Sequence, residues 1–176
     1  MQVVVLRHGP AHDPNPLSWP DDRDRPLTEA GEHRVERVAA GLKRLLPRVG
    51  GFATSSSQRA RRTAEIVRTV WAREDPIVEW SELSPGEPAE PILGKLARVA
   101  IGPVPWILVG HEPTLSEWVG LATCGEERSV VVLGRAGAAC VDFEADVRPG
   151  GARVVWLLSA NQLEDLGQMT APYPFR

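Results

Sequence analysis

The chain has 176 residues, of which 43% are hydrophobic and 24% are charged, and its formal net charge is −3. This composition is that of an ordinary globular protein and excludes fibrous and disordered classes. The slight negative charge gives no reason to expect nucleic acid or an anionic membrane as a partner, so an anion site requires a local cluster of cations.

Cys124 and Cys140 are the only cysteines, and their spacing fits neither a zinc site nor a redox motif. No run approaches the roughly 18 apolar residues of a membrane span, and the first residues enter a strand instead of a leader segment. We therefore expect one cytoplasmic domain over residues 1–176, with an irregular tail at about 169–176.

The first third of the chain predicts a strand, a loop and a helix. An apolar run at residues 3–6 predicts a buried strand that ends in Arg7-His8-Gly9. Residues 10–26 are rich in proline and predict a loop, which lies beside the strand end. A helical stripe of apolar residues follows, with Thr28 as its N-cap, and is closed at Pro47.

The middle of the chain repeats the order strand, polar turn, helix. Residues 52–54 predict a short strand that runs into three serines, and a helix follows through residues 60–71. Another strand is expected at 77–80, then a loop at 84–88 and a weaker helix at about 91–99.

The last part of the chain adds further strands. A buried strand at 106–109 ends in Gly-His-Glu-Pro, and residues 115–121 suit a helix. Three more strands are predicted, of which the last two form a hairpin, at 130–133, 138–143 and 154–158. These elements predict one α/β domain with a mixed sheet.

Three segments place reactive side chains where a strand gives way to a turn or a helix. They contain Arg7 and His8, residues 55–59, and His111. Parallel strands would bring these segments to one edge of the sheet, where α/β folds hold their ligands. Histidines and arginines beside helix N-termini suit a phosphoryl group, so we predict a phosphate pocket at this edge.

Four motifs in this order resemble those of the histidine phosphatase superfamily. They are Leu-Arg-His-Gly at 6–9, Arg-Pro-Leu-Thr-Glu-Ala-Gly at 25–31, Thr-Ser-Ser-Ser-Gln-Arg-Ala at 54–60 with Thr-Ala-Glu at 63–65, and Val-Gly-His-Glu-Pro at 109–113. The short length, with Glu-Leu-Ser-Pro at 82–85 and Trp-Leu-Leu-Ser at 156–159, is most similar to the small bacterial phosphohistidine phosphatase branch. The resemblance implies a phosphoglycerate mutase-like fold, with three α/β/α layers and a mixed, mostly parallel central sheet.

The resemblance also implies roles for single residues. His8 would be the nucleophile that carries the phosphoryl group, a role compatible with neutral imidazole near pH 7. Arg7, Arg59 and His111 would clamp the phosphoryl oxygens, and Arg25 would add to the pocket. No metal or cofactor is implied, because these side chains supply the charge. Four other cationic or imidazole side chains are predicted at the surface: His12, His33, Arg61 and Arg62.

One family feature is missing from this sequence. Larger relatives place an acid two positions after Leu83 to protonate an alkoxide, and here that position is Pro85. Glu82 and Glu87 are the nearby carboxylates. A missing acid favours a labile P–N bond, and the short chain leaves little room for a lid, so we predict that phosphohistidine proteins are the substrates.

Two alternatives stay open at this point. The first is a phosphatase of small phosphate esters that uses Glu82 or Glu87 as its acid. The second is a non-catalytic module that holds a phosphorylated partner with the same clamp.

Overall fold

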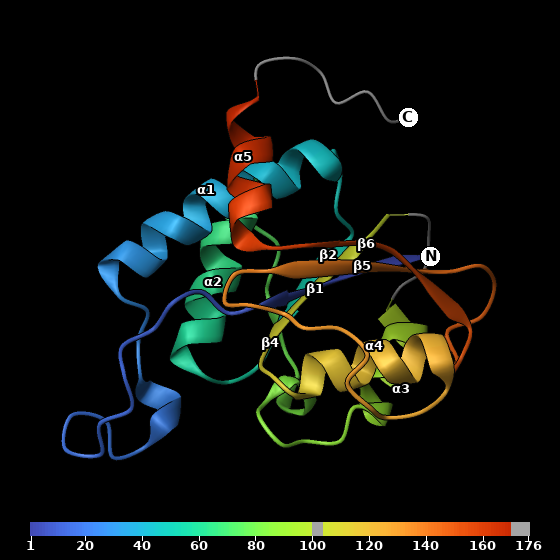
Figure 1. Ribbon diagram of the computed structural model, residues 1–176, viewed down its shortest axis with the longest axis horizontal. Helices are drawn as coiled ribbons and strands as arrows, with labels where there is room; N and C mark the ends of the chain where they lie inside the picture. Colours follow the sequence, from blue (N-terminus) through green and yellow to red (C-terminus); the bar gives the residue numbers. More distant parts are fainter. Residues whose placement is uncertain (100–103, 170–176) are drawn as a thin grey trace.

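The computed structural model describes residues 1–99 and 104–169, so the predicted tail lies outside the described residues except for Met169. A six-stranded sheet forms the centre of the molecule (Figure 1). Its strands are β1 (Gln2–Arg7), β2 (Gly51–Thr54), β3 (Val78–Glu79), β4 (Trp106–Gly110), β5 (Ala138–Phe143) and β6 (Ala152–Leu158).

The order of strands in the sheet is β3-β2-β4-β1-β5-β6. The pairs from β3 to β1 are parallel, whereas β1 with β5 and β5 with β6 are antiparallel, so the sheet is mixed and mostly parallel as predicted. Arg7 lies opposite Gly110, and Thr54 lies opposite Val109. This register places the carboxyl ends of β1, β2 and β4 at one level.

Helices cover both faces of the sheet, which gives the three expected layers (Figure 1). One face carries α1 (Glu29–Leu45), α2 (Gln58–Thr69) and α5 (Ala160–Gln168), and the other carries α3 (Glu90–Val99) and α4 (Thr114–Cys124). Val4 and Leu6 pack with the first group and Val3 and Val5 with the second. These four apolar side chains of β1 are fully buried, as expected for a continuous apolar run.

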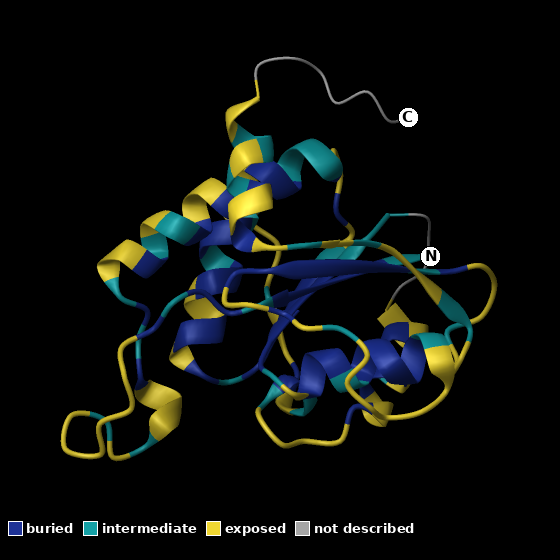
Figure 2. Cartoon of the chain, in the orientation of Figure 1, coloured by how far each residue is buried: buried dark blue, intermediate teal, exposed yellow. Residues whose placement is uncertain are grey.

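The loop that follows β1 projects from the body of the molecule, at the lower left of Figure 1. It is largely exposed (Figure 2) and contains a short 3₁₀ turn, η1 (Asp22–Asp24). Two backbone hydrogen bonds close its base, from Thr28 N–H to the Pro10 carbonyl and from His12 N–H to the Pro26 carbonyl. Thr28 caps α1, as predicted, because its hydroxyl accepts from Gly31 N–H at 3.0 Å.

The structure differs from the sequence predictions at three places. Residues 130–133 form no strand; Leu133 is buried while Val132 is exposed. The strand expected at 77–80 is only the two residues of β3. Helix α5 was not predicted, although Ser159 and Gln162 form a capping box at its start.

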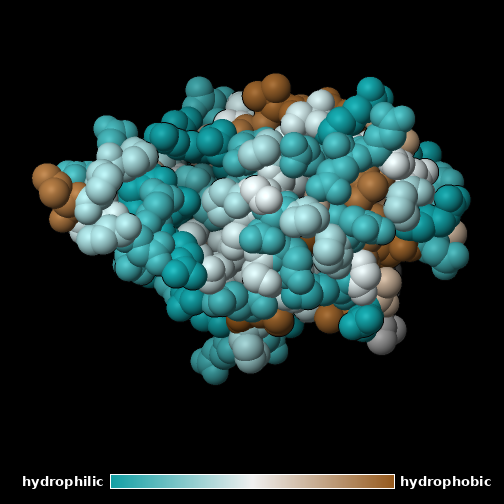
Figure 3. Space-filling model, turned by 90° about the horizontal axis from the view of Figure 1, so that it is seen from below, coloured by the Kyte–Doolittle hydropathy of each residue, from teal (hydrophilic) through white to brown (hydrophobic). Residues whose placement is uncertain are grey.

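The face of the molecule seen in Figure 3 is largely hydrophilic, with apolar groups scattered mainly towards its margins. Within the described ranges, none of the helices has both the length and the apolar character that a membrane span requires. The buried apolar side chains form two clusters, one on either side of the sheet.

Candidate active site

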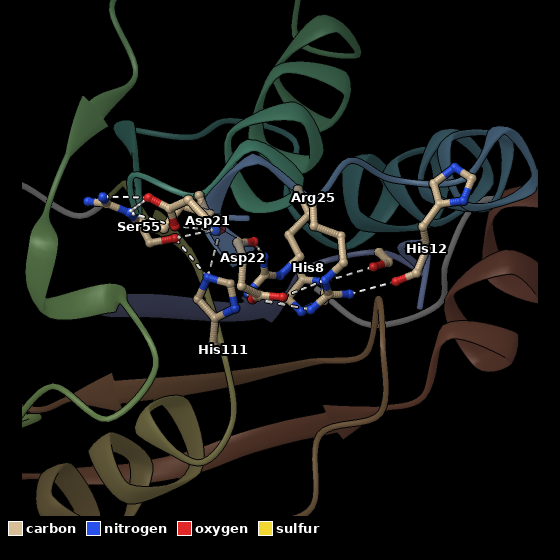
Figure 4. Close-up of polar contacts among 11 residues, drawn as sticks. His8, His12, Asp21, Asp22, Arg25, Ser55 and His111 are labelled. Atoms are coloured by element: carbon tan, nitrogen blue, oxygen red, sulfur yellow. Dashed lines mark hydrogen bonds and ion pairs between the residues drawn. The ribbon is translucent and has the colours of Figure 1, made fainter. Parts of the chain in front are cut away.

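The segments that follow β1, β2 and β4 meet at one edge of the sheet, as the strand pattern predicts (Figure 4). The backbone N–H of His8 donates to the Gly110 carbonyl at 3.1 Å, and that of Ser55 donates to the Val109 carbonyl at 3.3 Å. The rings of His8 and His111 lie 4.9 Å apart between their centroids. The two predicted site histidines are therefore neighbours.

His8 is held as a neutral imidazole with a defined proton. Its Nδ1 lies 2.7 Å from the Gly9 carbonyl oxygen, which only accepts, so Nδ1 carries the hydrogen and Nε2 carries the lone pair. Burial lowers the pKa of His8 to about 4, and the charges of Arg59, Arg7 and Arg25 act in the same direction against the hydrogen bond to Gly9.

His111 is also buried, and two serine hydroxyls fix its ring. Its Nε2 lies 2.8 Å from Ser55 Oγ and 3.0 Å from Ser57 Oγ (Figure 4). Burial lowers the pKa of His111 to about 2, with His8 and Arg59 as further causes, so the ring is neutral at pH 7. In this structure the ring is a neutral hydrogen-bonding group.

Arg59 and Arg7 each present an unpaired donor. Arg59, in the first turn of α2, directs Nη1 to the Asp22 carbonyl at 2.6 Å and Nη2 to the Asp22 carboxylate at 2.9 Å. Arg7 directs Nη1 to the Leu133 carbonyl at 2.8 Å. The Nε of each arginine is buried and has no protein partner among the described residues. A buried donor of this kind is costly unless an acceptor, such as a phosphoryl oxygen, completes it.

Arg25 lies in the same network, on the loop side of the site. Its Nε donates to Asp22 Oδ1 at 2.7 Å and its Nη1 to the His12 carbonyl at 2.7 Å (Figure 4). The Asp22 carboxylate therefore links Arg25 to Arg59. Nothing in the sequence pattern singled out Asp22, because the contact joins η1 to a helix 37 residues away.

Glu82 is turned towards another partner. Its Oε2 lies 2.5 Å from Lys95 Nζ. Burial is the largest single influence on the pKa of Glu82 and would raise it, but the hydrogen bond and charge of Lys95, together with hydrogen bonds from the backbone and Ser81, leave the pKa below its usual value. Glu87 is exposed in the loop between η2 (Ser81–Leu83) and α3. Within the described part of the chain, no hydrogen bond or ion pair joins either glutamate to His8 or to the arginines.

Glu112, directly after His111, is a half-buried carboxyl group. Its Oε2 accepts from the Ser116 hydroxyl, while its Oε1 is buried and has no partner in residues 1–99 and 104–169. Burial raises the pKa of Glu112, against the opposite effects of Ser116 and Arg7.

The remaining side chains that the sequence placed outside the site are exposed, as predicted. Arg61 forms an ion pair with Glu79, and Arg62 forms one with Glu32. His12 and His33 are likewise exposed. Among the residues that the structure describes, no three His, Cys, Asp or Glu side chains are grouped in a way that would hold a metal ion.

A family model and a relative match this chain in sequence. The family model of the histidine phosphatase superfamily (branch 1) matches residues 3–85. An uncharacterized protein from Picosynechococcus sp. is 33% identical over 173 residues, which cover 98% of this chain and 97% of the relative.

Two solved structures show the same architecture. The protein histidine phosphatase SixA complexed with tungstate has a TM-score of 0.79 at 22% identity, covering 93% of this chain and 99% of that one. A mycobacterial glucosyl-3-phosphoglycerate phosphatase complexed with VO3 has a TM-score of 0.65 at 16% identity, with coverages of 90% and 98%. The fold is thus phosphoglycerate mutase-like, and the chain belongs to the histidine phosphatase superfamily.

Proposed function

We propose that this protein is a phosphatase that forms a covalent phosphohistidine on His8 and acts on phosphohistidine in other proteins. The observation that carries the proposal is the state of His8, which is buried, neutral and bonded through Nδ1 to the Gly9 carbonyl. Its Nε2 lone pair is therefore free at neutral pH in a site that three arginines surround.

In the first step, Nε2 of His8 forms a bond to phosphorus as the bond from phosphorus to the substrate nitrogen breaks. The bonding electron pair stays on the departing nitrogen, and the substrate imidazole leaves as a neutral ring because its other nitrogen carries a proton. Arg7 and Arg59 offer buried Nε donors to the phosphoryl oxygens. Donors placed in advance where charge develops contribute about a hundredfold or more in rate each.

In the second step, water attacks phosphorus and the bond to His8 breaks. The proton on Nδ1 is retained throughout, because the Gly9 carbonyl holds it. His8 therefore leaves as a neutral imidazole, and water supplies the protons that the released phosphate carries. This step requires no acid at the His8 nitrogen.

Phosphohistidine is the favoured substrate because its leaving group is also an imidazole nitrogen. Like His8 in the second step, this nitrogen leaves phosphorus without an acid to protonate it. An alkyl phosphate ester releases an alkoxide, which needs a proton donor. Glu82 is paired with Lys95 instead of facing His8, and Glu87 lies in an exposed loop. The similarity in fold to a protein histidine phosphatase adds support at the level of the fold.

The proposal extends to metal independence and to a cytoplasmic location. Three guanidinium groups supply the positive charge that a metal ion would otherwise bring. Both cysteines are free thiols, as is usual for a protein in a reducing compartment. Activity is therefore expected to persist in the presence of a chelator.

The test is to mix the protein with a phosphohistidine protein and to follow both substrate loss and acid-labile phosphate on the enzyme by mass spectrometry. We expect phosphate on His8 in the wild type and neither phosphate nor turnover in His8→Ala. His33→Ala, which removes an exposed histidine, is the matched control and should behave as the wild type. Efficient hydrolysis of sugar phosphates without activity on phosphohistidine would refute the substrate assignment, and binding without turnover would indicate a non-catalytic module.

A further inference from the structure

The carboxylate of Asp22 contacts two buried arginines of the candidate site, Arg59 and Arg25, and Figure 4 shows it beside Arg25. Its Oδ1 accepts from Arg25 Nε at 2.7 Å, and its Oδ2 lies 2.9 Å from Arg59 Nη2 and 3.4 Å from Arg25 Nη2. The two arginine side chains are only 4% and 10% exposed, whereas that of Asp22 is 54% exposed. An exposed residue thus supplies the anion that two buried cations share.

A carboxylate and a phosphoryl group bind arginine through the same paired N–H donors. On Arg59, the unpartnered Nε is next to Nη2, and these two donors form one fork. Asp22 already occupies Nη2. A phosphoryl group that engages the whole fork must therefore compete with the Asp22 carboxylate for this donor.

Backbone carbonyl groups hold both arginines independently of this carboxylate. Arg59 Nη1 donates to the main-chain oxygen of Asp22 at 2.6 Å, and Arg25 Nη1 donates to that of His12 at 2.7 Å. These bonds persist if the Asp22 side chain swings away into solvent. The carboxylate is therefore not required to keep the guanidinium groups in place.

The charge of Asp22 is present at neutral pH. The hydrogen bond from Arg25 is the largest influence and lowers its pKa, burial opposes this effect, and the charge of Arg59 adds to the lowering. Its charge also acts to raise the pKa of His111, against the larger effect of burial. Asp24, two residues further along the same turn, is exposed, and no side-chain hydrogen bond or ion pair joins it to another of the described residues.

We propose that Asp22 is a specificity-determining residue, an internal anion that competes with the phosphoryl group for Arg59 and Arg25. Small phosphates must displace it with the binding energy of the phosphoryl group alone, so they bind weakly. A phosphorylated protein brings further contacts and displaces it at less net cost. The selectivity for protein substrates rests on the proposed function, whereas the competition between anions does not.

The test is equilibrium titration of the intact protein with inorganic phosphate at pH 7. Asp22→Asn is expected to bind phosphate roughly three- to tenfold more tightly than the wild type, a range typical of an exposed ion pair or slightly stronger. Asp24→Asn removes the same charge from the same turn and is expected to stay within about twofold of the wild type. Thermal unfolding of all three proteins shows whether the fold is retained.

Two outcomes would overturn the proposal. If Asp22→Asn binds phosphate no more tightly than the wild type, Asp22 positions the arginines instead of competing for them. If Asp24→Asn tightens binding equally, the effect is a general one of loop charge.

Phosphoramidate, a small P–N compound, tests selectivity: its kcat/KM relative to that of a phosphohistidine protein should rise in Asp22→Asn. A wild type without phosphohistidine turnover would contradict the proposed function but leave the phosphate titration valid.

Discussion

Nδ1 of His8 lies 2.7 Å from the carbonyl oxygen of Gly9, the next residue in the chain. A carbonyl oxygen fixes the proton on Nδ1 without itself taking a proton, so the lone pair of the ring lies on Nε2, the nitrogen that the proposed mechanism uses. Many catalytic histidines are oriented by a carboxylate, which raises their pKa. Here the orienting group is neutral, and burial of the ring, assisted by the surrounding arginines, keeps it unprotonated.

A pH titration of the His8 ring by NMR checks this arrangement. The ring is neutral above its pKa of about 4 and gains a proton below it, because burial and the nearby arginines oppose a positive charge. We expect a midpoint well below the ordinary imidazole value of about 6.5. Arg59→Gln removes one of the cations and should move the midpoint upwards. A midpoint near 6.5 in the wild type would contradict a buried, neutral nucleophile.

The ends of the central strands could be predicted from the sequence because their signals are local. An apolar run that stops at Arg7-His8 indicates a buried strand with a polar end, and β4 ends in the same way before His111. Parallel pairing then places these ends together, as the register of β1 with β4 shows. The histidines of the site follow from this logic alone.

The contacts that hold the site side chains could not be predicted because they join distant segments. Arg7 donates to the carbonyl of Leu133, 126 residues away, and residues 130–133 have the apolar pattern of a strand without forming one. In the sequence, Asp22 is one of several acidic residues in a polar loop. Only the tertiary fold brings Arg59 of α2 beside it. Helix α5 is short, and its capping box was its main signal.

Substitution of Arg59 tests the clamp against its neighbour in the same helix. Arg59→Ala removes a buried guanidinium from the site, and we expect kcat on a phosphohistidine protein to fall about a hundredfold or more. Arg61→Ala removes an exposed arginine that pairs with Glu79 and should change kcat by less than about twofold. Equal losses in both variants would show that the effect comes from helix charge and not from contact with the phosphoryl group.

Replacement of Glu82 tests the alternative of an ester phosphatase. Because Glu82 is paired with Lys95, we expect Glu82→Gln to leave hydrolysis of both a phosphohistidine protein and a phosphate ester within about twofold of the wild type. Lys95→Met breaks the same ion pair but keeps the carboxyl group. Loss of ester turnover in Glu82→Gln alone would identify Glu82 as the missing acid.

Two helical glycines give a matched test of how α5 is fixed to the rest of the protein. A methyl group at Gly41 of α1 would overlap the backbone carbonyl of Leu163 in α5, whereas one at Gly94 of α3 would meet nothing within 4 Å. Helix propensity alone predicts that alanine stabilises both positions by about 0.5–1 kcal/mol. We expect that gain only for Gly94→Ala. For Gly41→Ala we expect a loss of about 1–3 kcal/mol in the free energy of unfolding, because backbone atoms cannot give way as a flexible side chain can.

Urea unfolding of the two variants beside the wild type measures this difference. Helix α5 packs directly on α1, so the strain of Gly41→Ala must be relieved by separating these helices. A stabilised Gly41→Ala would mean that α5 does not approach α1 this closely in solution. The helices on this face of β1 would then be packed less closely than the full burial of Leu163 indicates.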